Sequence, residues 1–74
     1  MEKNDEQLIL TLLGKDAELK RYYDEHLDLE RQIAALQHKL YLTADEELQK
    51  KRLQKLKLAG KDRIMEILAR YRGH

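Results

Sequence analysis

Few side chains in this chain could carry out chemistry, and the clearest candidates are one histidine and one glutamate. His26 and Glu30 are four residues apart, a spacing that puts both side chains on one face of a helix. Such a pair could act as a general base or contribute to a metal site. One pair is too small for either task without ligands from other chains. We therefore expect a packed histidine whose ring nitrogen bonds a nearby polar group.

No other reactive group strengthens this pair. The chain has no cysteine, which excludes a thiolate zinc site, and its three glycines are isolated rather than grouped in a phosphate-binding loop. Thr11 and Thr43 are the only serine-like hydroxyls, and Thr43 is expected to cap a helix. The sequence thus predicts no catalytic residue, no metal ligand, no cofactor and no enzymatic activity.

The elements that position these residues are predicted to be helices. Mostly apolar residues recur at alternating spacings of three and four, which places them along one stripe of a helix, as in the seam of a coiled coil. Leu40 continues the first stripe, and a second stripe follows it along the chain. The residues predicted to form this helix-pairing seam are Leu19, Tyr22, His26, Leu29, Ile33, Leu36, Leu53, Leu56, Gly60, Ile64 and Ile67.

Capping signals divide the chain into helices at about 4–13, 16–41 and 44–71. Asn4 or Asp5 could cap the first helix and Asp16 the second, because their oxygens accept the free amides of a first turn. Thr43 and Glu46 fit a capping box. The 74 residues are therefore predicted to form a single all-α domain, 1–74. Its fold would be an antiparallel helical hairpin with a short N-terminal helix.

The short turn also predicts which residues face each other. If the turn lies near residue 43, the hairpin pairs Ile33 with Leu53, Leu19 with Ile67, and His26 with Gly60. A glycine inside a helix costs about 1 kcal/mol relative to alanine, so a packing reason is expected. We expect the imidazole of His26 to lie on the bare backbone of Gly60, and Gly60→Leu to destabilise the protein by overpacking.

Apolar residues outside this seam predict self-association. They need burial elsewhere, either by folding the first segment back over the last helix or at a subunit interface. A chain of this length buries only a small core, so we prefer a dimer of hairpins that forms a helical bundle. The candidate oligomer or partner surface comprises Leu8, Ile9, Leu12, Leu13, Leu58, Met65 and Leu68.

Charge is unevenly placed although the net charge is only +1. Residues 1–46 hold six Lys/Arg and eleven Asp/Glu, whereas residues 47–74 hold nine and three. The basic last helix could bind nucleic acid, or the two halves could be neighbours that attract each other, which we favour. The function indicated is a helical module that binds an unknown partner protein, with nucleic-acid binding as the alternative. The acidic start and the lack of a long apolar run predict a cytoplasmic protein without membrane contact.

The spacing of several residues resembles the YdcH-like family of short bacterial helical proteins, a domain of unknown function. The resemblance rests on Leu19, Tyr22, His26, Leu29 and Ile33, on the acidic turn after Thr43, and on the Lys57-Leu58 and Lys61-Asp62 pairs before Ile64. Leu19 and Gly60 depart from the usual pattern, which has an aromatic and a larger apolar residue there. The resemblance implies a helical hairpin in the bacterial cytoplasm and no reaction or cofactor.

Overall fold

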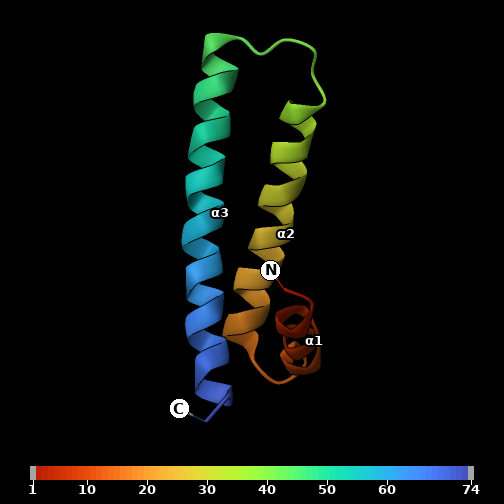
Figure 1. Cartoon of the computed structure of the whole chain (residues 1–74), viewed down its shortest axis with the longest axis vertical. Helices are drawn as coiled ribbons and strands as arrows, with labels where there is room; N and C mark the ends of the chain where they lie inside the picture. The colour runs from red at the N-terminus through yellow and green to blue at the C-terminus, as the bar shows by residue number, and fades with distance from the viewer. Residues whose placement is uncertain (1, 74) are drawn as a thin grey trace.

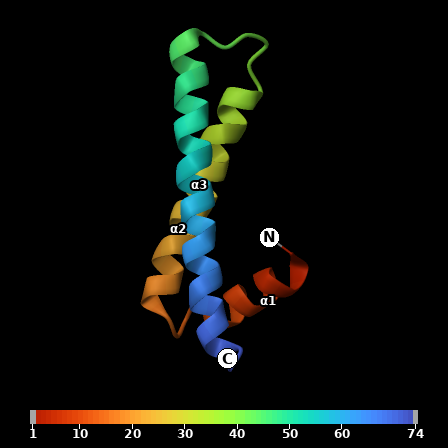
Figure 2. The same ribbon diagram turned by 60° about the vertical axis from the view of Figure 1, so that its left-hand side comes forward.

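The computed structural model describes residues 2–73, which fold into three helices without a strand. They are α1 (Lys3–Leu12), α2 (Ala17–Gln37) and α3 (Ala44–Tyr71). The long helices α2 and α3 lie side by side and run in opposite directions, an arrangement compatible with the predicted hairpin (Figure 1). The shorter α1 lies at the end of this pair away from the connecting loop (Figure 1, Figure 2). None of the helices within residues 2–73 has the length and apolar character needed to cross a membrane.

Two apolar clusters hold the helices together, one at each end of the pair. Near the loop, Ile33 and Leu36 of α2 pack with Leu53 of α3. At the other end, Leu19 of α2 packs with Ile64 and Ile67 of α3 as well as with residues of α1. Ile33 shares a cluster with Leu53, and Leu19 shares one with Ile67, which is compatible with the register that the short turn predicts. Burial of these side chains is the main source of stability in so small a chain.

Two of the three helices begin with the side-chain cap that the sequence predicts. Asp16 caps α2 by accepting a hydrogen bond from the Leu19 amide at 3.0 Å. Thr43 and Glu46 form the capping box that begins α3. The first helix begins at Lys3 without a side-chain cap, so the expected cap by Asn4 or Asp5 is wrong.

The second helix is shorter than the sequence predicts, because it ends at Gln37 and not near residue 41. Leu40 and Tyr41 are 92% and 89% exposed, so Leu40 does not continue the seam, and Leu42 packs against the cluster near the loop instead. Packed helices have axes 8–10 Å apart. A helix running to residue 41 would leave only residues 42 and 43 to cross that gap before α3 begins, whereas residues 38–43 cross it comfortably.

The first helix folds back over α3, which is one of the two arrangements expected for it. The apolar cluster at the end away from the loop buries Ile9, Leu12 and Leu68. The expectation that these three residues form an oligomer surface is therefore wrong. Leu8, Leu13 and Met65 pack against this cluster and are partly buried. Of the predicted surface only Leu58, 60% exposed, remains fully available. Apart from Leu58, the residues of the predicted surface are therefore buried or partly buried within their own chain.

Opposite charges face each other between the helices. Arg70 lies 3.5 Å from Glu18, Lys57 3.8 Å from Glu30, and Arg72 2.6 Å from Asp5. These contacts account for part of the uneven charge by attraction within the chain. Such exposed pairs contribute little to the free energy of unfolding. Their main effect is to favour this arrangement of the helices over others.

Candidate functional site

The predicted seam residues divide into a buried set, a half-buried set and one exposed residue. The buried set is Leu19, His26, Ile33, Leu36, Leu53, Ile64 and Ile67. Tyr22, Leu29 and Gly60 are half-buried. Leu56 is 58% exposed, so its expected place inside the seam is wrong. At 3.6 residues per turn, Leu56 lies to one side of the stripe, and Lys57, paired with Glu30, lies nearer its centre.

His26 is the one polar side chain in the core of residues 2–73. Its Nε2 lies 2.9 Å from Oε1 of Glu30, and its ring stacks on Tyr23 with centroids 6.4 Å apart. Burial lowers the pKa of His26; the Glu30 carboxylate opposes this, while Lys57 and Lys61 add to it. The Nδ1 atom on the other side of the ring has no hydrogen-bond partner within residues 2–73. The His26–Glu30 pair thus serves packing, and no third ligand-type side chain among the described residues joins it into a metal cluster.

Gly60 does not meet His26 as expected. A Cβ added at Gly60 would have no neighbouring atom within 4 Å, so the expected packing of the imidazole on this position is wrong, and His26 gives no reason to expect overpacking by Gly60→Leu. The expected register places the two residues at the same height along the hairpin, but the space that a Cβ at Gly60 would enter does not hold the His26 ring. No contact among the described residues explains why position 60 lacks a side chain.

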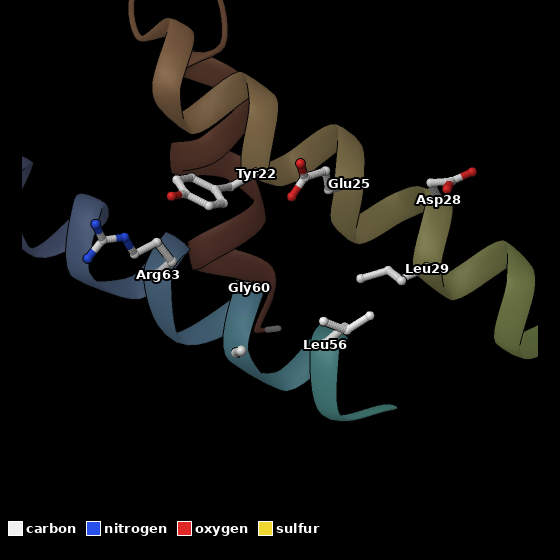
Figure 3. Close-up of a pocket in the computed structure, with 8 residues that line it drawn as sticks. Tyr22, Glu25, Asp28, Leu29, Leu56, Gly60 and Arg63 are labelled. Atoms are coloured by element: carbon white, nitrogen blue, oxygen red, sulfur yellow. The ribbon is translucent and has the colours of Figure 1, made fainter. Parts of the chain in front are cut away.

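The open space beside Gly60 belongs to a groove of about 410 Å³ between α2 and α3. From α2 it is lined by Tyr22, Glu25, Asp28 and Leu29. From α3 it is lined by Leu56, Ala59, Gly60 and Arg63. Figure 3 shows Tyr22 and Arg63 at one end, Asp28, Leu29 and Leu56 at the other, and Gly60 between them. No residue of α1 contributes to the lining, so this groove lies on the flank of the pair that α1 leaves uncovered.

The two ends of the groove differ in charge. At one end, the guanidinium groups of Arg63 and then Arg21 lower the pKa of the Tyr22 phenol, and Arg63 also lies 3.0 Å from Glu66. Asp28 lies at the other end, where its carboxylate is 3.3 Å from Arg31 of the same helix, and Glu25 lies on α2 between Tyr22 and Asp28 (Figure 3). Glu25 has no ion-pair partner within residues 2–73. The groove therefore offers apolar side chains from both helices and charges of both signs.

Sequence reasoning identified part of this groove and missed the rest. Tyr22, Leu29, Leu56 and Gly60 were predicted as seam residues, whereas the groove charges were not predicted. One signal in the sequence could have revealed the groove. Leu56, Gly60 and Arg63 are spaced by four and three residues, which places them on one side of α3, but in the sequence this spacing resembles an irregular seam.

Comparison of the chain with protein-family models, curated proteins and solved structures finds no match. The resemblance to the YdcH-like family therefore stays a prediction from the residues alone.

Proposed function

We propose that the chain is a non-enzymatic helical module that binds a partner protein through the groove between α2 and α3. The observation that carries this proposal is the open groove itself, with the exposed Leu56 side chain beside the bare backbone of Gly60. Amphipathic helices bind such grooves by inserting apolar side chains between two helices. Glycine lets a partner backbone approach closely, and charged residues at the ends select the orientation.

The wider predictions belong to the same proposal. They are membership of the YdcH-like family, a bacterial cytoplasmic location, and self-association as a helical bundle. Self-association is supported by the small core of a 74-residue chain and by the exposed groove. It no longer draws support from Ile9, Leu12 and Leu68, which are buried by their own chain.

Nucleic-acid binding by α3 is the alternative. It is supported by Lys51 and Lys55, which are exposed and lie beside Leu58, and which have no ion-pair partner within residues 2–73. Phosphate binding by lysines must weaken steeply with salt. Protein binding through an apolar groove depends far less on salt.

The test is retention of partners from a cytoplasmic extract on the immobilised chain, compared between groove and control variants. Leu56→Glu places a charge in the groove and should abolish retention, whereas Leu58→Glu, on the same helix outside the groove, should not. Retention of the same proteins by Leu56→Glu and the unaltered chain would overturn the proposal. Nucleic acid that is retained at low salt, released by moderate salt and lost in Lys51→Glu/Lys55→Glu would establish the alternative.

A further inference from the structure

Gly60 is unusual because it lies in the interior of the 28-residue helix α3, where no atom of residues 2–73 requires the lack of a side chain. Glycine destabilises a helix interior, and a Cβ here would meet nothing within 4 Å. The empty space opens into the groove. A close approach from outside the chain is the steric role left for this glycine.

The charges of the groove are arranged so that it complements itself. Arg63 lies at one end beside Tyr22, and Asp28 lies at the other end beside Leu29 and Leu56, with Gly60 between them (Figure 3). If a second α3 crosses this groove in the opposite direction at Gly60, its Arg63 arrives at the end that holds Asp28. The same contact forms again with the roles exchanged, which is the property of an interface with two-fold symmetry.

We infer that the occupant of the groove is the α3 helix of a second copy of this chain, with the two helices crossing at Gly60. This inference rests on the proposed function and names its partner. In the dimer, Arg63 of each copy faces the carboxylates of Glu25 and Asp28 of the other. Leu56 of each copy is covered by the Tyr22 end of the other groove.

Other occupants match the groove less well. An acidic helix would meet Glu25 and Asp28, and a purely basic helix would meet Arg63. A helix that carries both signs in the reverse order satisfies both ends, and α3 of a second copy supplies Arg63 opposite the acidic end. The acidic residues opposite Arg63 come from α2 of the same second copy, so the whole hairpin takes part.

The first experiment is sedimentation equilibrium of the full chain at about 100 μM, where a dimer with a Kd near 10 μM is largely formed. We expect a dimer mass for the unaltered chain and for the control Ala69→Leu, which places the same leucine side chain at an exposed position of α3. Gly60→Leu should raise the Kd at least about tenfold. Circular dichroism at a few micromolar should show that Gly60→Leu stays helical, because position 60 has room for a side chain.

A charge exchange tests the two-fold arrangement without added bulk. Arg63→Glu should be monomeric at 100 μM, and so should Glu25→Lys/Asp28→Lys, because each homodimer would bring like charges together at both ends. An equimolar mixture of the two variants should recover the dimer, because both ends then carry opposite charges.

A monomeric mass for the unaltered chain, a dimer insensitive to Gly60→Leu, or a mixture that stays monomeric would each overturn the inference. The proposed function fails by a different result, namely extract proteins that bind the Leu56→Glu variant and the unaltered chain alike. The two failures are therefore distinguishable.

Discussion

The two flanks of the α2–α3 pair show what a neighbouring helix does for the same α-helical surface. On one flank, α1 covers Leu68 completely with the help of Ile9 and Leu12. On the other flank no helix covers the pair, and Leu56 of the same α3 remains 58% exposed beside the groove. The covered flank provides stability within the chain, and the uncovered flank is the one that we propose for binding. Variants that affect one flank and spare the other can break or sharpen this distinction.

The largest effect should come from placing a charge on the buried face of α1. Ile9→Asp should destabilise the protein by on the order of 4 kcal/mol, because the fully buried Ile9 position offers a carboxylate no compensation. Leu10→Asp is the matched control, since Leu10 is 61% exposed on the same helix. Urea denaturation followed by circular dichroism measures both. Equal loss in the two variants would mean that α1 does not cover the core.

Truncation of one leucine on each flank should give the next largest difference. Leu68→Ala should cost about 3 kcal/mol because it leaves a cavity under α1. Leu56→Ala should cost about 0.5 kcal/mol or less in the monomer because its side chain is mostly in solvent. The measurement is urea denaturation at a few micromolar protein. A larger loss for Leu56→Ala would show that the groove flank is covered even in the monomer.

Gly60→Ala should stabilise the monomer by about 1 kcal/mol, because alanine favours the helix and its Cβ has open space. For a chain of this size the melting temperature should rise by about 4–8 °C. Thermal melts at low protein concentration check this result. A lower melting temperature would place Gly60 against other atoms of its own chain and close the groove.

The smallest effect should be a pH dependence from His26, on the seam beneath the two flanks. Its pKa is lower in the folded protein than its ordinary value, so the unfolded chain takes up a proton first as the pH falls. Stability should therefore be complete above pH 6.5 and decline as the pH drops from 6.5 through the folded pKa. Glu30 and Tyr23 contact this ring, and the charges of Lys57 and Lys61 act on it from α3.

The control for this pH effect is His26→Leu, which should flatten the dependence between pH 8 and pH 5.5. The carboxylates of Asp16 and Glu46, whose pKa values are lowered chiefly by Tyr71 and Lys39 respectively, lose their contributions only at lower pH. Chemical denaturation across this pH range gives the result. An unchanged slope in His26→Leu would assign the effect to another group.

The features that the sequence predicted well are local ones. The caps at Asp16 and Thr43 depend on residues three positions apart, and the stripe through Leu19 and Ile33 follows from helix periodicity. These patterns fix which residues enter a helix and which side of the helix is apolar. They require no knowledge of the distant parts of the chain.

The features that the sequence did not predict depend on distant neighbours. Gln37 ends α2 without a glycine or proline because the loop must reach α3, and Ile9 is buried because α1 folds back over Leu68. The groove was not predicted because two of its residues, Glu25 and Arg63, are charged, and a search for apolar periodicity does not include charged residues. Leu56 was assigned to the seam on its residue type, although its position along α3 turns it to the side.

The order of the cross-helix contacts along this 45 Å molecule has a kinetic consequence. Lys39 and Glu46, beside the loop, are seven residues apart in the chain, whereas Asp16 and Tyr71 are 55 apart and Asp5 and Arg72 are 67 apart. Joining distant residues first requires a larger loss of chain entropy than joining near ones. Folding should therefore start around the short loop and advance along the hairpin like a zipper. Docking of α1 comes last, so α1 should also be the first element to open in the folded protein.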